Sequence, residues 1–538
     1  MTNTEKFIEK RLDGARKTFC LELNLEQAYN RDEELKGEYH GRELFELLQN
    51  VDDAYEHLCQ LDESKKDKPV EVLIEYKDNV LRVCNMGEPF SSDAIQRLCQ
   101  GGVSSKGKEY IGNKGIGFRS ILNWAKEIHL YSGDFSIGFS EKFAQEQFEF
   151  IKDNETVKKQ LAKNPSIKFP ILRAPKCIEK KQFNYREPFA TIIEIIVDEK
   201  TQQDNFTVKK QIEEFNPNIL LFLPNITKVS FVLSDESYSF CKTLNKQSDV
   251  MITSVRREQE NTVVSENKFY LFSECCEIKN PFAKEKASRI KLAIAIPMEY
   301  SPENKYQLYT FFPIRKENCP FHVLMHATFL LSSNRDTFKN DKEDENVLVF
   351  KELLEFYVKS VTAYFCKPEF GNLMLKLLCP INFQQQSIVF DRPFSTVEIS
   401  NWYFKLCREH ISFQTVNGNF IKIDDNPKII SVDVPTFFKG NEFSDLLCKL
   451  DDTVKSFAEK LLGNAEFTDE ELCERINKLA GRLSIAERAE TFILWAENRK
   501  QESVVPLLLK DDKCDKYDYL VAVGCGIVGG LIDIFLVG

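Results

Sequence analysis

The sequence predicts an α+β fold spread over several domains, and three observations support this prediction. The chain has 538 residues, which is too long for one compact domain. Hydrophobic residues make up 43% and charged residues 29%, as in folded rather than disordered proteins. Some segments carry apolar residues at helical spacing, and others alternate as strands do. We predict an α/β sandwich domain at 1–200, an α+β middle domain at 201–385, a mainly helical region at 386–517 and a hydrophobic tail at 518–538.

The first predicted domain opens with two helices. Apolar spacing places them at residues 3–30 and 41–58. Residues 70–76 and 80–84 are predicted to be the two strands of a hairpin. Residues 87–114 hold five glycines and several serines, a composition typical of a lid. The other predicted elements are a helix at 115–124 and strands at 128–131, 135–139 and 191–197, with a polar, lysine-rich insertion at 141–189.

The pattern changes after residue 205. The predicted elements of the middle domain are a helix at 207–215, strands near 227–233, 268–273, 289–297, 306–313 and 321–331, and a closing helix at 345–365. Such a run of strands with flanking helices is typical of an α+β domain. Residues 395–510 have mostly helical spacing, notably 443–462 and 469–497.

Charge and cysteine content narrow the function classes. The net charge of −11 argues against a protein that mainly wraps nucleic acid, because phosphate contacts need a basic surface. The 16 cysteines include no Cys-x-x-Cys pair, so a structural zinc site is not expected. No leader opens the chain, and we expect thiols in a reducing cytoplasm. His322 and His326 are four apart on a predicted strand, where packing is favoured over zinc binding.

The last 20 residues have an unusual composition. Residues 519–538 are nearly all apolar, with Asp533 as the one charged exception. Their length just reaches the roughly 20 residues that span a bilayer. Five glycines among them would allow close helix packing in a membrane. We therefore keep three interpretations: a membrane-associated tail, a buried hairpin or strand at the end of a domain, and a domain that is truncated.

One pair of polar residues on the helix at 41–58 suggests chemistry. Glu46 and Asn50 are four apart, so both project from the same face of the helix. A carboxylate can orient and deprotonate a water, and an amide oxygen can bind Mg²⁺. The alternative is the exposed polar face of an amphipathic helix.

A second segment follows directly after a predicted strand. Asn85 can reach the edge of a base there, and Gly87 leaves room for a ring to lie against the backbone. Taken alone, this segment is more simply explained as an ordinary turn.

A third segment, Gly112-Asn-Lys-Gly115-Ile-Gly117, opens a predicted helix. Glycines let backbone N–H groups face a phosphate, and the helix N-terminus adds a favourable field. Lys106 and Lys114 could neutralise a triphosphate. The segment is not a Walker A loop, because no Gly-Lys-Ser/Thr follows at the required spacing. It is not a Rossmann fingerprint either, because the preceding strands form a hairpin.

The order of these segments resembles the GHKL superfamily of ATPases, which includes the heat-shock protein 90 family, DNA gyrase B, MutL and sensor histidine kinases. The resemblance covers about residues 1–200. Ser104-Ser105-Lys106 and Gly-Asn-Lys-Gly-Ile-Gly-Phe-Arg-Ser are most similar to the sacsin-type branch. The resemblance implies a GHKL-type α/β sandwich that binds Mg-ATP.

The resemblance also implies roles for individual residues. Glu46 would be the general base, Asn50 would hold Mg²⁺, and Asp53 would support the ribose and base. Thr191 matches the late threonine that helps to bind adenine. The cofactor-binding set is Asn50, Asp53, Asn85, Gly87, Ser104, Ser105, Lys106, Gly112, Lys114, Gly115, Ile116, Gly117, Phe118 and Thr191.

Two positions need separate comment. The family usually carries Asp where this chain has Asn85, although an amide oxygen can also accept a hydrogen bond from the adenine amino group. In the heat-shock protein 90 and MutL families a basic residue of the second domain reaches the γ-phosphate. The segment around Ser332-Ser-Asn-Arg335-Asp336 is similar to sacsin-like proteins, so Arg335 or Lys339 is the candidate here. The alternative for Arg335 is a structural arginine.

The expected function is a slow ATP-driven conformational switch, chaperone-like or defence-associated. It would act on a protein client and would form a homodimer on binding ATP. Two alternatives stay open: a nucleotide-sensing interaction module in which hydrolysis is unimportant, and a DNA-acting relative of gyrase B or MutL. The acidic net charge counts against the second alternative.

Overall fold

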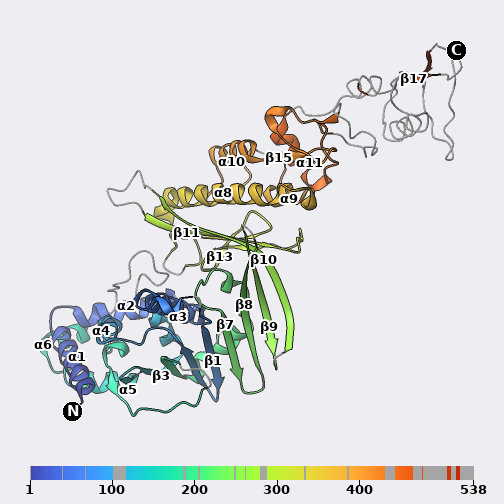
Figure 1. Ribbon diagram of the computed structural model, residues 1–538. Coiled ribbons are helices and arrows are strands. Elements are labelled where there is room, and N and C mark those ends of the chain that lie inside the picture. Colours follow the sequence, from blue (N-terminus) through green and yellow to red (C-terminus); the bar gives the residue numbers. More distant parts are fainter. Residues whose placement is uncertain are drawn as a thin grey trace. The chain divides into compact units, whose positions relative to one another are not determined.

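The computed structural model divides the chain into two compact units, residues 1–353 and residues 354–538. It describes all residues except 1, 39, 67, 101–116, 186–188, 204–205, 248–249, 261, 279–287, 333–334, 385–386, 430–442, 464–474, 476–505, 511–516 and 522–538. Helices and strands both contribute, so the prediction of a mixed helix and strand fold is confirmed (Figure 1).

The predicted helix at 3–30 is in fact two helices. These are α1 (Asn3–Phe19), which Thr2 caps, and α2 (Asn24–Glu38). The chain turns between them at Glu22, whose φ is 45°. The turn lets Phe19 and Leu25 bury in one hydrophobic cluster with residues of the 141–189 segment. The predicted continuous helix was therefore wrong because burial of these two side chains outweighs helical spacing.

The helix that carries Glu46 and Asn50 is α3 (Glu43–Leu61). A hairpin follows, formed by β1 (Glu71–Lys77) and β2 (Val80–Asn85). Asp78 and Asn79 make the turn with φ of 49° and 59°, the left-handed conformation that two-residue hairpin loops need. The hairpin prediction is confirmed.

Strands β1 to β14, all in the first unit, form one mixed sheet among the described residues. Its order is β13-β12-β14-β11-β10-β9-β8-β7-β1-β2-β6-β3-β4-β5. The strands that follow the hairpin are β3 (Ala125–Ser132), β4 (Phe135–Ser140), β5 (Lys176–Cys177), β6 (Thr191–Val197), β7 (Lys228–Leu233), β8 (Ser237–Gln247), β9 (Val250–Gln259), β10 (Thr262–Ile278), β11 (Ser288–Pro297), β12 (Gln307–Thr310), β13 (Phe312–Asn318) and β14 (Leu324–Ala327).

The predicted boundary near residue 200 falls inside this sheet. β7 pairs in parallel with β1, and β8 to β14 extend the sheet from there (Figure 1). Sequence analysis did not identify β8 and β9, because the alternation of apolar residues in both strands is interrupted by polar residues such as Lys242 and Thr253. Both side chains are nevertheless buried in the structure.

Helices cover one face of the strands that belong to residues 71–197. α1, α3 and α4 (Ser92–Gln100) pack on alternate residues of these strands, and this packing forms the main core of the unit. The predicted helix at 115–124 is instead a 3-10 helix, η2 (Gly117–Asn123). The remaining helices of this unit are α5 (Glu141–Glu149), α6 (Glu155–Lys163) and α7 (Val208–Glu213), and the other 3-10 turns are Glu63–Lys65, Ile171–Arg173, Glu199–Gln203, Pro217–Leu221 and Asn340–Lys342.

The opposite face of the same strands is polar. Arg82 Nε donates to Glu194 at 2.6 Å and Arg82 Nη1 to Glu75 at 2.7 Å. His129 and Lys181 also contact the Glu194 carboxylate, at 3.1 and 2.8 Å. Burial opposes ionisation of Glu194, but these hydrogen bonds outweigh it and lower the pKa of the carboxyl group. The apolar and polar faces alternate along each strand, as in a sheet with one face on the core.

Helices dominate the described part of the second unit. Helix α8 (Glu343–Phe365) begins in the first unit and ends in the second, and α9 (Leu373–Leu378), α10 (Val397–His410) and α11 (Asp452–Leu462) follow. The hairpin β15 (Ser412–Gln414) and β16 (Phe420–Lys422) lies after α10, with 3-10 turns at Pro368–Phe370 and Ile423–Asp425.

Two helix predictions for the second unit need correction or stay open. The helix at 443–462 is shorter than predicted, because the Leu446 and Leu447 backbones bond to Val416 and Lys428 instead of continuing a helix. The predicted helix at 469–497 lies almost entirely outside the described residues.

The start of the hydrophobic tail forms a strand. β18 (Tyr517–Val521) pairs with β17 (Pro506–Lys510), so residues 506–510 are not helical as predicted. The rest of the tail lies outside the described residues. Among the helices that are described, none is long and apolar enough to cross a membrane.

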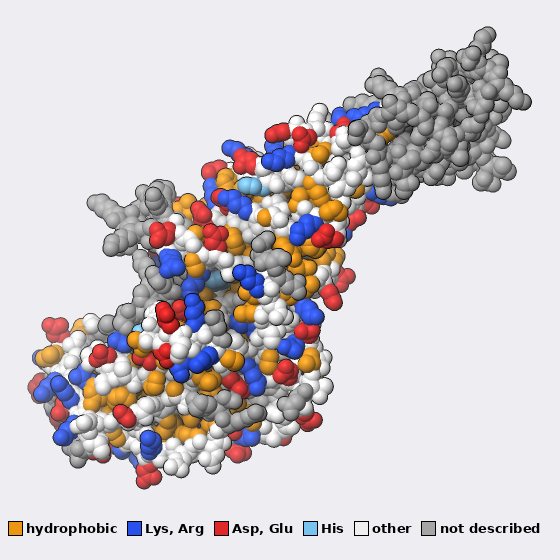
Figure 2. Space-filling view, viewed as in Figure 1, with side chains coloured by type: hydrophobic (Ala, Val, Ile, Leu, Met, Phe, Trp, Pro, Cys, Tyr) orange, Lys and Arg blue, Asp and Glu red, His pale blue; other side chains and the backbone are white. Residues whose placement is uncertain are grey.

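Acidic and basic side chains are interspersed over the visible face of the N-terminal unit (Figure 2). The cysteines that the structure describes are all free thiols, in agreement with the expectation from their spacing. His326 is buried, its Nδ1 accepts a hydrogen bond from the Phe311 N–H at 3.0 Å, and burial lowers its pKa to about 3. It is a packed neutral histidine, as expected.

Candidate functional site

Helix α3 buries an unusual number of acidic side chains. Glu43, Glu46, Asp52 and Asp53 are each at most 3% exposed, although ionisable side chains are seldom buried without partners. Glu46 and Asn50 lie one turn apart on this helix, as the sequence predicts. The partners of these carboxylates therefore define what the helix can do.

Arg335 reaches Glu46 from the segment after β14. Its Nη1 lies 2.9 Å from Glu46 Oε1 and donates to Gln49 Oε1 at 2.9 Å. Both side chains of the ion pair are largely buried, with 14% and 4% exposed. The structure thus brings together the two residues that sequence analysis named as catalytic.

Arg335 is held in a tight turn. Its φ is 56°, and its backbone N–H donates to the Ser332 carbonyl at 2.9 Å. Ser332 and Thr337 then bond to each other, and Leu331 bridges Phe338 across the base of the turn. A left-handed conformation at a non-glycine residue costs energy and is often found at functional sites.

A second layer of arginines fixes this turn against the start of α3. Arg42 Nη1 donates to the Arg335 carbonyl and lies 3.9 Å from Asp336. Arg315 donates to the Gly41 carbonyl at 2.6 Å and also lies 3.9 Å from Asp336. Burial is the main reason why the pKa of Arg42 falls to about 10, so its guanidinium stays charged at neutral pH. Sequence analysis did not identify Arg42, Arg315 or Asp336.

The other candidate from this segment lies elsewhere. Lys339 Nζ pairs with Asp341 at 3.3 Å, and nearly half of its side chain is exposed. Of the two basic residues proposed to reach a phosphate, the structure places Arg335 at α3 and Lys339 in a surface ion pair.

A buried network positions the N-terminal end of α3. Glu43 is fully buried and accepts hydrogen bonds from the Gly41 N–H at 2.9 Å, Asn123 at 3.0 Å and Gln211 at 2.6 Å. It therefore ties α3 to η2 and α7. Its sequence neighbours gave no sign of this role.

A similar network holds the C-terminal half of α3. Asp52 accepts from the backbone N–H groups of Asn225 and Ile226 at 3.0 and 3.2 Å. Burial raises the pKa of Asp52 to about 6, while nearby Lys242 opposes this shift. Lys242 itself donates to the Leu223 carbonyl at 2.6 Å. This network ties the C-terminal half of α3 to the segment that precedes β7.

The predicted base-binding residues lie together at the end of β2. Asn85 and Thr191 are direct partners across β2 and β6, and both are buried. Asn85 Oδ1 accepts from the Gly87 N–H at 3.1 Å, and Thr191 Oγ1 lies 2.6 Å from Ser132 Oγ. These hydroxyl and amide groups form a compact polar set at one edge of the core.

Gly87 brings this set against α3. A Cβ at this position would lie 2.7 Å from Ala54 Cβ and 3.0 Å from its backbone carbon. The next residue, Glu88, donates its N–H to the Ala54 carbonyl at 3.1 Å. Glycine is therefore required for this close approach of the backbone after β2 to α3.

Most of the predicted phosphate-binding residues cannot be placed. Ser104, Ser105, Lys106, Gly112, Lys114, Gly115 and Ile116 lie outside the described residues. Gly117 begins η2, and Phe118 is buried in the main core. The next residue, Arg119, donates to Asp32 at 2.9 Å and to the Leu98 carbonyl at 3.2 Å, which fixes η2 to α2 and α4.

The polar face of α3 has hydrogen-bonding capacity left for a ligand. Within the described residues, Gln49 Nε2 and Asn50 Nδ2 are buried atoms without a hydrogen-bond partner, whereas Glu46 Oε1 is held in the ion pair with Arg335. Buried polar groups are normally satisfied, so these two amide groups are donors with unused capacity. Asn50 fits Mg²⁺, because magnesium commonly takes one or two protein oxygens and completes its shell with phosphates and water. No cluster of three His, Cys, Asp or Glu side chains that could hold a metal alone occurs in the described part of the chain.

The chain is similar to part of one known plant protein. No family model matches the chain. The chain is similar to "Protein NO VEIN" of Arabidopsis thaliana, with 20% identity over 340 residues. The match covers 61% of this chain and 11% of that protein, so the chain corresponds to a small part of a much longer relative.

Proposed function

We propose that the chain binds Mg-ATP on the polar face of α3 and hydrolyses it slowly as a conformational switch of the GHKL type. The contact between Arg335 and Glu46 carries this proposal. Motif reasoning assigned these two residues to one reaction from distant parts of the sequence, and they are neighbours in the fold. The layer of α1, α3 and α4 on one face of the sheet supports a GHKL-type sandwich.

The described side chains suggest how the residues divide the work. Asn85 and Thr191 would recognise the base, and Asp53 would support the ribose side. Asn50 would hold Mg²⁺, which neutralises charge on the phosphates when bound. Glu46 would take a proton from the attacking water, and Arg335 would stabilise charge on the transferred phosphoryl group.

The ion pair gives the switch a physical basis. The guanidinium at 2.9 Å occupies the Glu46 carboxylate, which would otherwise be available to the attacking water. A triphosphate would compete with Glu46 for Arg335, because Arg binds phosphate oxygens well. Release of Glu46 would then couple nucleotide binding to activation of the base and to movement of the turn that carries Arg335.

Binding can be tested by thermal unfolding with Mg²⁺ alone and with Mg-ATP. At about a hundred times the dissociation constant, ligand adds roughly 2.7 kcal/mol to the native state. We expect this rise in the wild type, its loss in Asn50→Ala, and its retention in Asn245→Ala, an exposed control on β8. If no nucleotide raises the unfolding temperature of the wild type, the proposal is wrong.

A nucleotide-sensing module is the second candidate, and the same ion pair favours it. If Arg335 stays on Glu46 after ATP binds, the carboxylate remains occupied and the protein senses nucleotide without turnover. Phosphate release by the wild type that does not exceed release by Glu46→Gln, with Mg-ATP binding intact in both, would select this candidate.

A further inference from the structure

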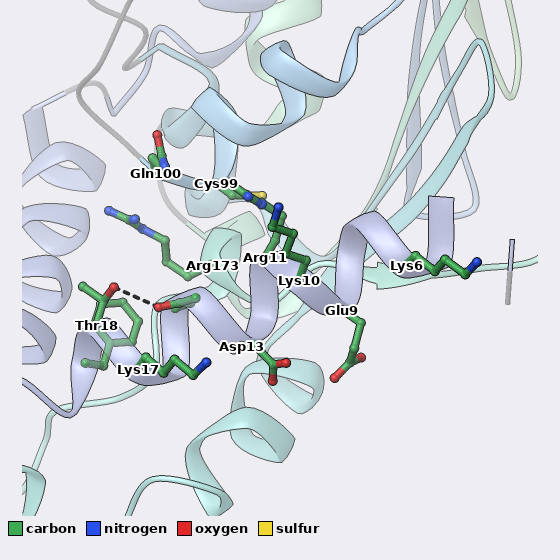
Figure 3. A pocket seen from close by; sticks show the side chains of 13 residues that line it. Lys6, Glu9, Lys10, Arg11, Asp13, Lys17, Thr18, Cys99, Gln100 and Arg173 are labelled. Atoms are coloured by element: carbon green, nitrogen blue, oxygen red, sulfur yellow. Dashed lines mark hydrogen bonds between the residues drawn. The ribbon is translucent and has the colours of Figure 1, made fainter. Parts of the chain in front are cut away.

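A cavity beside α1 carries a concentration of positive charge that the α3 site does not explain. It has a volume of about 760 Å³ and lies between α1, the end of α4 and Arg173 (Figure 3). No α3 residue lines it. The basic side chains that line it are Lys6, Lys10, Arg11, Lys17 and Arg173. Two acidic residues, Glu9 and Asp13, also line it, which leaves an excess of three positive charges.

The two acidic residues do not neutralise the cavity. Both face Arg16, whose Nη1 lies 3.5 Å from Glu9 and 2.9 Å from Asp13. Arg16 does not line the cavity. In Figure 3 the Arg11 side chain extends from α1 toward Cys99, whereas Glu9 and Asp13 extend from the other side of the helix. Both carboxylates are therefore already paired with Arg16, although they line the cavity.

The five cations lack such partners. None of them forms an ion pair with a carboxylate in the part of the chain that the structure describes, and Arg11 Nε is buried without a hydrogen bond. The guanidinium groups of Arg11 and Arg173 instead lie over the rings of Phe7 and Phe19, at 5.5 and 6.0 Å. Partly buried arginines without counter-charges are costly, so an external anion would stabilise them.

Arg119 adds to the positive electrostatic potential of the cavity. Arg119 lies close enough to Arg173 to oppose its charge, although burial is the main reason why the pKa of Arg173 falls to about 10. The nearby carboxylate of Asp32 is already bonded to Arg119. The cavity is therefore a positive site within a chain whose net charge is −11.

We propose that this cavity binds a small phosphorylated anion, at a site separate from α3. Its volume lies in the range of roughly 300 to 1,000 Å³ that is usual for small-molecule sites. Arginine forks match phosphate oxygens, and the amide of Gln100 adds a neutral donor at the same wall. The exposed side chains of Lys10 and Lys17, which also line the cavity, would attract the anion electrostatically.

Gly14 provides a test that spares the fold. It lies on the cavity face of α1, and a Cβ built on it would meet nothing within 4 Å. Gly14→Glu would place a carboxylate in the cavity, and Gly14→Gln would place a neutral side chain of the same size there. Both residues are better helix formers than glycine, so both variants should fold.

The experiment is titration calorimetry of the full chain with inorganic tripolyphosphate, without magnesium and at fixed ionic strength. We expect saturable binding in the wild type that weakens at least about tenfold in Arg173→Gln and Arg11→Gln, since bonds to charged groups contribute this much. Gly14→Glu should weaken binding more than Gly14→Gln. Asn50→Ala should retain binding, which separates this site from α3, and Lys163→Gln serves as an exposed cation control.

Three results would overturn the proposal. They are no saturable binding by the wild type, equal binding by Gly14→Glu and Gly14→Gln, or an equal loss in Lys163→Gln and Arg173→Gln, which would indicate diffuse charge attraction. Tighter binding of a short single-stranded DNA, lost in the same variants, would replace the small anion with nucleic acid.

Discussion

The α3 site and the α1 cavity treat buried charge in opposite ways. On α3, Glu43 and Glu46 lie against donors or an arginine supplied by the protein itself. In the α1 cavity, Arg11 and Arg173 have no carboxylate partner among the described residues. The α3 site is therefore organised before any ligand arrives, whereas the α1 cavity needs a counter-charge from outside.

Arg42 and Arg173 are both largely buried arginines, but their charged neighbours differ. Burial lowers the pKa of both to about 10. Arg42 also has Glu46 and Asp336 nearby, which favour its charge. Arg173 has Arg119 as its strongest charged neighbour, which opposes its charge. Equal pKa values can thus arise where the strongest charged neighbour favours the charge and where it opposes the charge.

The largest expected effect concerns hydrolysis at α3. In Glu46→Gln the general base is lost, and we expect ATP turnover to fall roughly 100- to 10,000-fold. The amide keeps the size of the side chain, so the Mg-ATP-induced rise in unfolding temperature should remain. Phosphate release and thermal unfolding measured on the same preparation check this. Unchanged turnover would show that α3 carries no base.

The next effect tests whether the buried acids of α3 depend on their partners. Glu43→Ala leaves the donors of Asn123, Gln211 and Gly41 without an acceptor. Breaking a buried charged network in this way typically costs about 3 kcal/mol or more. Calorimetric unfolding should show the loss, and Glu9→Ala on the exposed side of α1 is the control. Equal effects of the two changes would contradict the contrast between the two regions.

Local spacing was enough to predict one side of the α3 site. Glu46 and Asn50 share a helix face, and Asn85 follows a strand, so both observations come from neighbours in sequence. For Gly87 sequence analysis predicted room for a ligand ring, whereas the structure shows close packing against Ala54 of α3. Arg335 was found only through similarity of motif order, because no local pattern points from it to α3.

The residues that were missed depend on distant partners. Arg42 bonds to a carbonyl 293 positions away, and Gln49 to a side chain 286 positions away. No spacing rule covers such distances. The α1 cavity was missed for a different reason: each lysine and arginine of α1 alone is consistent with a solvated helix face. Only the fold shows that Arg173 faces them and that Arg16 occupies the acids.

Substitution of Gly87 and of Gly14 by alanine should have opposite effects on stability. Gly87→Ala forces a Cβ to within 2.7 Å of Ala54, and overpacking of this kind typically costs about 1–3 kcal/mol. Gly14→Ala meets nothing within 4 Å and should stabilise α1 by up to about 1 kcal/mol. Denaturant unfolding should show a lower free energy of unfolding for Gly87→Ala and a higher one for Gly14→Ala than for the wild type. If Gly87→Ala is as stable as the wild type, the close contact between β2 and α3 is not required.

The smallest expected change in stability is that of Arg173→Gln, and its sign relative to that of Arg335→Gln distinguishes the α1 cavity from the α3 site. Arg335→Gln leaves Glu46 without its cation and should destabilise the chain. Arg173→Gln removes a partly buried charge that faces other arginines, so we expect it to stabilise the chain by about 0.5 kcal/mol at low ionic strength. Salt should reduce this gain, because it screens the repulsion between arginines. Thermal unfolding across a salt series measures both changes. A loss of stability in Arg173→Gln would mean that the protein itself compensates this arginine, and the α1 cavity would then resemble the α3 site.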